Sequence, residues 1–242
     1  MVPIRVLVVD DSAFMRKVIT EIIHAETDME VVGFARNGQD ALRKLAQLEV
    51  DVVTLDVEMP VMDGLETLRH IMDENPLPVV MLSSRTKKGS ETTVQALALG
   101  AVDFIAKPSG PISLDMELVA QEITHKLRLA ASAQFHRPKK PSVTPKRKAS
   151  LTFPEPTQGA ATKLVIIGSS TGGPKAVEEV FAHLPPNLPA GIVVVQHMPK
   201  DFTRSFAERL DSLFPFPVKE ASNGDLVENG KVLIAPGDFH LM

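Results

Sequence analysis

The sequence contains no cysteine, and this absence excludes two kinds of stabilising structure. Disulfide bonds and thiolate metal sites both require cysteine, so neither is available to this chain. A chain without cysteine fits a reducing compartment. The sequence also lacks an apolar run of about 20 residues, the length that a membrane-spanning helix needs. Met1 to Arg5 do not begin the basic and then apolar pattern of a secretory signal. We therefore expect a cytoplasmic protein.

An excess of basic charge is absent as well, since the formal net charge is −4. This balance gives no reason to expect nucleic-acid binding. The apolar fraction of 44% and the charged fraction of 23% are typical of a soluble globular protein. The 242 residues are enough for one large domain or two ordinary ones.

A change of composition in the middle of the chain favours two domains. Residues 136–150 carry six Lys or Arg and three Pro but no acidic residue. Such a segment cannot bury enough apolar surface to offset the entropy of ordering it. The basic run would also suit an acidic surface, but a solvated tether is the preferred interpretation. We predict a first domain over 1–125, a helix end and basic linker over 126–161, and a second domain over 162–242.

The first domain alternates strand and helix signals. Five short apolar or β-branched runs are separated by stretches with helical periodicity. A last helix is predicted over residues 114–133. This alternation predicts a five-stranded, doubly wound parallel α/β sheet. The predicted strands are Val6–Val9, Glu30–Phe34, Val52–Leu55, Val79–Leu82 and Asp103–Ile105.

The second domain repeats the alternation over a shorter length. Predicted strands cover residues 164–167, 192–195, 218–220 and 232–234, and the first two have the apolar content of buried parallel strands. One helix is expected to open at Pro174, a residue suited to a first helical turn, and another to run over residues 202–213. The chain ends at Met242 without a closing helix, so we expect an incomplete parallel α/β domain.

Carboxylates follow two strands of the first domain. Asp10 and Asp11 come after the first strand and Asp56 after the third, so a parallel sheet places all three at one edge. Three carboxylates repel one another unless a cation joins them, and Mg²⁺ prefers such oxygen ligands. Lys107 and Ser83 follow two further strands, where they suit phosphoryl oxygens. In the alternative interpretation the two adjacent aspartates cap a helix and Lys107 is a surface charge.

These residues occur in a pattern that resembles the receiver domain of two-component response regulators. The motifs are Val8-Val9-Asp10-Asp11-Ser12, Asp56 to Gly64, Ser83 and Lys107-Pro108, within residues 4–125. The resemblance implies that Asp56 accepts phosphate from a chemotaxis histidine kinase. It also implies Mg²⁺ bound by Asp11, Asp56 and the backbone carbonyl of Glu58, with Asp10 in support.

The same resemblance assigns roles to three further residues. Ser83 is the implied switch hydroxyl, and Lys107 is the implied phosphate-binding lysine. Phe104 stands where the family often has a switching aromatic residue, and it lacks the hydroxyl of a tyrosine. The Lys107–Pro108 peptide bond is expected to be cis, as the tertiary amide permits.

A serine and a histidine follow the first two strands of the second domain. Ser170 lies in Gly168-Ser169-Ser170-Thr171-Gly172, which fits the G-x-S-x-G pattern of a nucleophile on a strand-to-helix turn. His197 comes 27 positions later, where adjacent strand ends bring it within reach of Ser170. The pair predicts a nucleophile and its general base. The alternatives are a glycine-rich turn that holds a phosphate and a structural histidine.

The surrounding segments resemble the catalytic domain of bacterial chemotaxis protein-glutamate methylesterases. The matching segments are Ile166 to Gly173 and Gln196 to Leu210. The resemblance implies that Ser170 is the nucleophile and His197 the base in hydrolysis of glutamate methyl esters on methyl-accepting chemotaxis receptors. It also implies deamidation of receptor glutamines, an activity of many members. It implies no cofactor in the esterase domain. Contact with the membrane is expected only through the receptors, and phosphorylation of the receiver is expected to release the esterase site.

One departure from this family concerns the third residue of its triad. The family's aspartate is expected beyond Met242, and Asp201, Asp211, Asp225 and Asp238 do not match it. We therefore expect a fragment or an early stop of a longer methylesterase, in which loss of imidazole orientation lowers the rate. The alternative function is a response regulator with a non-catalytic or phosphate-binding α/β output module. A DNA-binding output is disfavoured because no helix-turn-helix signature follows the linker.

Overall fold

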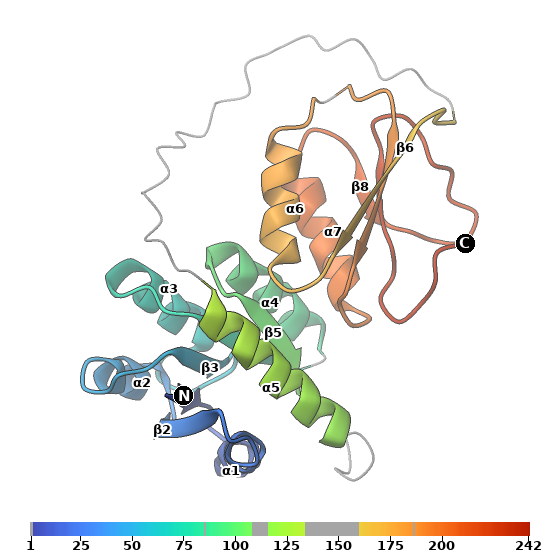
Figure 1. The fold of residues 1–242 in the computed structure, drawn as a ribbon. Coiled ribbons are helices and arrows are strands. Elements are labelled where there is room, and N and C mark those ends of the chain that lie inside the picture. Colours follow the sequence, from blue (N-terminus) through green and yellow to red (C-terminus); the bar gives the residue numbers. More distant parts are fainter. Residues whose placement is uncertain (1, 85, 108–115, 134–159, 186) are drawn as a thin grey trace. The chain divides into compact units, whose positions relative to one another are not determined.

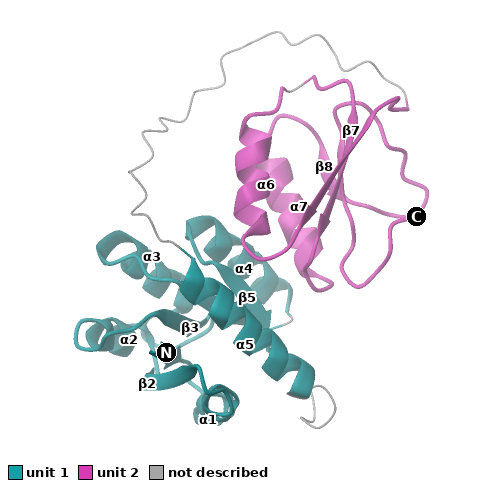
Figure 2. Ribbon diagram, viewed as in Figure 1, with its two compact units in different colours: residues 1–135 teal, residues 136–242 magenta. Residues whose placement is uncertain are grey.

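A computed structural model describes residues 2–84, 86–107, 116–133, 160–185 and 187–242. The chain divides into two compact units, Met1–Phe135 and His136–Met242 (Figure 2). Most of the predicted linker lies outside the described residues. The domain boundaries at 125 and 162 therefore stay predictions.

The first unit is built on a five-stranded parallel sheet with the strand order β2-β1-β3-β4-β5. This order makes β1 and β3 neighbours, and the chain winds outward from them in both directions. The predicted doubly wound sheet is confirmed. The strands are β1 (Ile4–Val9), β2 (Met29–Ala35), β3 (Val52–Asp56), β4 (Val79–Ser83) and β5 (Asp103–Ala106).

Helices cover both faces of this sheet (Figure 1). Because parallel crossovers are right-handed, α1 lies on one face and α2, α3 and α4 lie on the other. Helix α5 follows the last strand and packs beside α1. The helices are α1 (Ala13–His24), α2 (Gly38–Leu45), α3 (Gly64–Glu74), α4 (Lys87–Leu99) and α5 (Met116–Ser132). Coverage from both sides explains why Val6 to Val9 are completely buried.

Short polar side chains begin four of these helices. The side chains of Ser12, Asn37, Asp63 and Thr86 each accept a hydrogen bond from a backbone amide in the first helical turn. The cap of α1 is therefore Ser12, and the interpretation of Asp10 and Asp11 as helix caps is wrong. Both aspartates lie before the helix, where their carboxylates are available for other contacts.

The second unit contains a four-stranded parallel sheet with the order β6-β7-β9-β8. Its two helices lie on the same side of the sheet (Figure 1). Phe181 of α6 packs against Phe214 and Phe216, which follow α7, in one aromatic cluster. The elements are β6 (Leu164–Ser169), α6 (Gly173–Ala182), β7 (Gly191–Gln196), α7 (Phe202–Leu213), β8 (Val218–Glu220) and β9 (Val232–Ile234).

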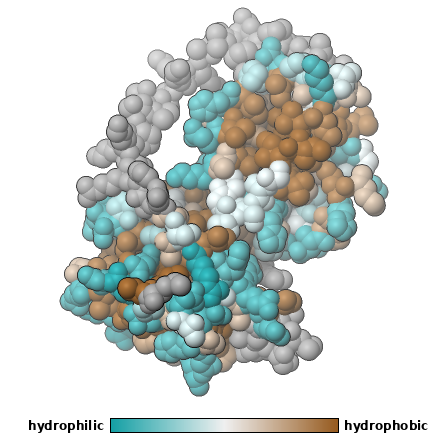
Figure 3. Space-filling view, in the orientation of Figure 1, coloured by the Kyte–Doolittle hydropathy of each residue, from teal (hydrophilic) through white to brown (hydrophobic). Residues whose placement is uncertain are grey.

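The expectation that β6 is a buried strand is wrong. Within the described residues β6 pairs with β7 alone, so it forms an edge of the sheet. Leu164, Val165 and Ile166 are 53%, 40% and 66% exposed. Figure 3 shows a continuous hydrophobic area over the part of the second unit where Figure 1 places β6. An apolar run indicates a strand that can be buried, but it does not show whether a neighbour is present to bury it.

The remaining element predictions agree closely with the structure. Helix α7 has the predicted bounds, and α6 begins one residue before Pro174. Helix α5 covers most of the predicted 114–133. The predicted cis bond at Lys107–Pro108 lies outside the described residues. Among the described residues, no helix combines the length and apolar character needed to cross a membrane.

Candidate functional site

The first candidate site lies at the carboxyl ends of β1 and β3. Asp10, Asp11 and Asp56 each offer a carboxylate oxygen, and these oxygens lie within 4.8 Å of one another. Asp10 is fully buried and Asp56 is 3% exposed. The Lys107 ammonium, at the end of β5, lies 2.8 Å from a carboxylate oxygen of Asp10 and 2.8 Å from one of Asp56. The structure thus brings together four of the residues that the sequence predicted for this site.

Burial and neighbouring charges shift the pKa values of this cluster in opposite directions. Burial raises the pKa of Asp56 to about 6, although Lys107 acts in the opposite direction. Burial also disfavours the charged form of Lys107, but the two carboxylates outweigh it and raise the lysine pKa. Three carboxylates face one ammonium, so the site retains an excess of negative charge. Its oxygen donors and its charge fit Mg²⁺, which binds through a few carboxylates.

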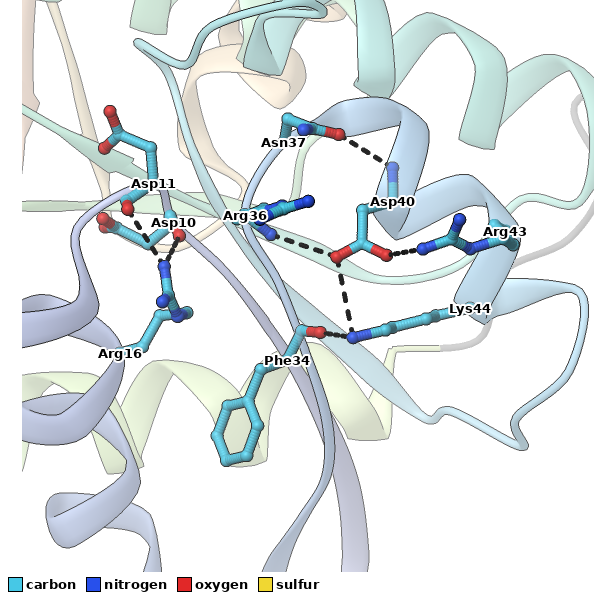
Figure 4. A network of polar contacts seen from close by, with 9 residues as sticks. All are labelled: Asp10, Asp11, Arg16, Phe34, Arg36, Asn37, Asp40, Arg43 and Lys44. Carbon is cyan, nitrogen blue, oxygen red and sulfur yellow. Dashed lines mark hydrogen bonds and ion pairs between the residues drawn. The ribbon is translucent and has the colours of Figure 1, made fainter.

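Arg16 supports the acidic residues through the backbone, and sequence reasoning missed it. Its guanidinium donates hydrogen bonds to the carbonyl oxygens of Asp10 and Asp11, at 2.7 and 3.0 Å (Figure 4). A second polar network, centred on Asp40, lies beside it at the start of α2. A cation in the first turn of a helix is disfavoured by the helix dipole. That position was the sequence signal that Arg16 has a specific partner.

The other predicted receiver residues occupy distinct environments. Ser83 is fully buried at the end of β4, and its hydroxyl donates to the Gly89 and Ser84 carbonyls. Phe104 is 2% exposed, and the Lys126 ammonium lies 5.2 Å from its ring centroid. Glu58 is exposed, and its backbone amide donates to Asp56 Oδ1 at 3.4 Å. The Glu58 amide thus directly contacts an acidic side chain of the site.

The second candidate site joins the ends of β6 and β7. Ser170 Oγ lies 3.3 Å from His197 Nδ1, and both residues are exposed. Gly172 adopts a left-handed conformation with φ of 74° and allows the chain to turn directly into α6. Ser170 lies just before the first turn of α6, where the Gly173 amide donates to the Ser170 carbonyl and Pro174 has no amide hydrogen. The arrangement therefore provides a serine nucleophile and a base beside the positive end of a helix dipole.

The segment after β9 packs against the loop that carries His197. Gly237 approaches so closely that a Cβ atom there would lie 2.5 to 2.6 Å from the backbone of residues 198–200. Its amide donates to the hydroxyl of Thr203, which is fully buried and donates in turn to Glu220. These contacts fix the start of α7 against the loop that carries the histidine.

None of the four downstream aspartates pairs with the histidine ring. Among the described residues, each has a different local role. Asp201 begins α7, Asp211 accepts from the Val218 amide, Asp225 pairs with Lys219, and Asp238 accepts from the Lys200 amide. The structure therefore places no described carboxylate in the orienting position of a triad.

Comparison with protein families matches both units. Residues 6–118 match the response regulator receiver domain, and residues 165–242 match CheB methylesterase. A crystal structure of the response regulator domain of Thermotoga maritima CheB is similar to this chain with a TM-score of 0.51 and 50% sequence identity. That similarity covers 55% of this chain and 99% of the other.

Relatives similar over nearly the whole chain carry the name protein-glutamate methylesterase/protein-glutamine glutaminase. The Halalkalibacterium halodurans protein is 52% identical over 241 residues, covering 98% of this chain and 67% of the relative. The Geobacillus kaustophilus protein is 53% identical over 244 residues, covering 99% and 68%. This chain thus spans about two thirds of their length, and it belongs to the protein-glutamate methylesterase/protein-glutamine glutaminase family, with a receiver domain followed by a CheB methylesterase domain.

Proposed function

We propose that this chain hydrolyses glutamate methyl esters on chemotaxis receptors in the cytoplasm, under control of phosphorylation at Asp56. Deamidation of receptor glutamines belongs to the same proposal, because the relatives' name includes it. The observation that carries the proposal is the 3.3 Å approach of Ser170 Oγ to His197 Nδ1. Both side chains are exposed, so a large substrate can reach them.

The proposed reaction uses the serine as a nucleophile. His197 accepts the hydroxyl proton of Ser170 as Oγ attacks the ester carbonyl. The tetrahedral intermediate expels methanol, which takes the proton from the imidazolium, and a glutamyl ester of Ser170 remains. Water attacks this ester with His197 again as base, which releases glutamate and restores the serine. The positive end of α6 favours the negative oxygen that develops in both steps.

The acidic site supports the proposed control. Asp56 is the proposed phosphate acceptor, with a chemotaxis histidine kinase as donor. Asp10, Asp11 and Asp56 would hold Mg²⁺, with Glu58 contributing its backbone carbonyl. The metal supplies positive charge for the phosphoryl oxygens when it is bound. Lys107 would stabilise the same oxygens through its ammonium group, and Ser83 and Phe104 are the proposed switch residues that respond to the phosphoryl group.

The test of the nucleophile is covalent labelling with a serine-reactive fluorophosphonate, located by peptide mass spectrometry. We expect the label on Ser170 and its loss in Ser170→Ala and His197→Ala. The control is Ser212→Ala, which changes an exposed serine on α7. Labelling elsewhere, or no labelling, would reject Ser170 as the nucleophile of this chain. A glycine-rich turn that only binds phosphate would not react.

A further inference from the structure

Gln196 is a buried polar residue at the end of β7, directly before the histidine. Side chains alternate along a strand, so Gln196 shares a face with Ile192 and Val194. Those two residues are 3% and 0% exposed, and Gln196 is 6% exposed. A carboxamide on such a face must find hydrogen-bond partners inside the protein, because burial without them is unfavourable.

The partners of Gln196 lie on both loops of the serine–histidine site. Its Oε1 accepts a hydrogen bond from Ser169 Oγ at 2.6 Å. Its Nε2 donates to the carbonyl oxygen of Ser170 at 2.9 Å and to that of His197 at 3.3 Å. One buried side chain therefore links the backbone of the nucleophile to the backbone of the base.

The start of α6 leaves room for this side chain. A Cβ atom at Gly173 would lie 2.1 Å from Gln196 Oε1 and 2.9 Å from Ser169 Oγ. Two backbone hydrogen bonds accompany the carboxamide. The His197 amide donates to the Ser169 carbonyl at 2.8 Å, and the Gly173 amide donates to the Ser170 carbonyl at 2.8 Å. The glutamine thus completes a connected network rather than filling a gap.

We propose that Gln196 is a positioning residue, which fixes the distance between Ser170 and His197 without touching the substrate. This inference rests on the proposed function of that pair. Both reacting side chains are exposed, so packing around them does not set their separation. An error of about 1 Å in such a pair lowers a rate by about 100-fold. The carboxamide is the described side chain that bonds to the backbone of both residues.

Three substitutions test the hydrogen bonds that the Gln196 side chain makes to the two loops. Gln196→Met keeps the length of the side chain and removes both N–H donors and the acceptor. Gln196→Glu keeps an acceptor for Ser169 but places a carboxylate against two carbonyl oxygens. Ser169→Ala removes one of the three hydrogen bonds. We expect Ser170 to lose reactivity most in the Glu variant, less in the Met variant and least in Ser169→Ala.

The matched control is Val218→Ala. Val218 is 5% exposed in β8, at the opposite edge of the sheet from β6, so its truncation destabilises the second unit without changing the two loops. Conditions are chosen so that all variants remain folded. We expect the rate constant for fluorophosphonate labelling of Ser170 to fall about 10-fold to 100-fold in Gln196→Met and to stay near the wild-type value in Val218→Ala.

Amide hydrogen exchange of the full chain gives a readout that does not depend on reactivity. In Gln196→Met we expect the His197 amide to exchange about 10-fold faster, with the Val194 amide unchanged. Exchange that rises equally at both positions would overturn the proposal, because it would indicate general destabilisation. Unchanged labelling in the Gln196 variants would also overturn it. Absence of labelling in the wild type, with local exchange at His197 still increased, would reject the nucleophile and leave the positioning role in place.

Discussion

The two units place reactive side chains at the same part of a parallel sheet, yet they stabilise them by different means. In the first unit two of the three carboxylates, those of Asp10 and Asp56, are almost fully buried and pair with Lys107. The third carboxylate, that of Asp11, is exposed. In the second unit Ser170 and His197 are exposed and neutral groups position them, chiefly the Gln196 carboxamide. The chemistry explains the difference. The acidic site has to admit only a metal ion and a phosphoryl group, whereas the proposed serine–histidine site has to admit a segment of a protein.

The two sheets also differ in how far their strands are buried. Strand β1 has neighbours on both sides and helices on both faces, and its side chains from Val6 to Val9 are completely buried. Strand β6 has the same apolar character but lies at an edge, with Ile166 66% exposed. Two strands of similar apolar sequence therefore contribute different amounts to the free energy of unfolding, because other elements cover β1 on both faces but leave much of β6 exposed.

The largest expected effect concerns the acidic site. Asp56→Asn removes the proposed phosphate acceptor, so we expect complete loss of phosphate incorporation from acetyl phosphate in the presence of Mg²⁺. Intact-mass spectrometry measures the incorporation. Asp40→Asn is the control, because it changes a carboxylate of the same unit that pairs with Arg43 and Lys44 instead. Phosphate incorporation that survives in Asp56→Asn would show that the buried cluster is not the acceptor site.

A pair of identical truncations compares the two sheets directly. Leu7 in β1 is fully buried, so Leu7→Ala should lower the free energy of unfolding of the first unit by about 2 to 5 kcal/mol. Leu164 in β6 is 53% exposed, so Leu164→Ala should cost the second unit less than about 1 kcal/mol. Hydrogen exchange with peptide resolution reads the two units separately in one sample. Equal losses would mean that another surface covers β6 in solution.

Sequence reasoning identified most of the fold because each element has a local signal. Apolar runs marked the strands, and the reactive residues followed those runs at the sheet edge that parallel topology dictates. The exposure of β6 was not predictable, because it depends on which strand lies next to it. Arg16 and Gln196 were missed for a related reason. Each acts through hydrogen bonds to backbone carbonyls. Folding brings the two carbonyls of Gln196 together, so no spacing pattern marks them, and the sequence signal for Arg16 was a cation near the start of a helix.

The burial of the Asp56 carboxyl predicts that the stability of the first unit depends on pH. Burial raises the pKa of Asp56 to about 6 from its ordinary 3.8. A raised carboxyl pKa contributes stability that is fully present below pH 3.8 and is lost as the pH rises through 6. Without divalent cations, wild type should therefore lose about 3 kcal/mol relative to Asp56→Asn between pH 4 and pH 8.

Thermal unfolding in EDTA over this pH range measures the difference. We expect the melting temperature of Asp56→Asn to exceed that of wild type at pH 8, and the two values to converge near pH 4. The second unit serves as an internal control, since its site contains no buried carboxylate cluster among the described residues. A constant difference at all pH values would mean that Asp56 titrates normally and that burial does not control its charge.

The smallest expected effect concerns the turn between β6 and α6. Gly172 has φ of 74°, and a Cβ atom there would meet nothing within 4 Å, so Gly172→Ala tests backbone conformation alone. We expect it to lower the stability of the second unit by about 1 kcal/mol. Gly168 has equally open surroundings without a positive φ, and Gly168→Ala should have almost no effect. Equal responses in denaturant unfolding would mean that the turn relaxes freely, and the separation of Ser170 from His197 would then depend still more on Gln196.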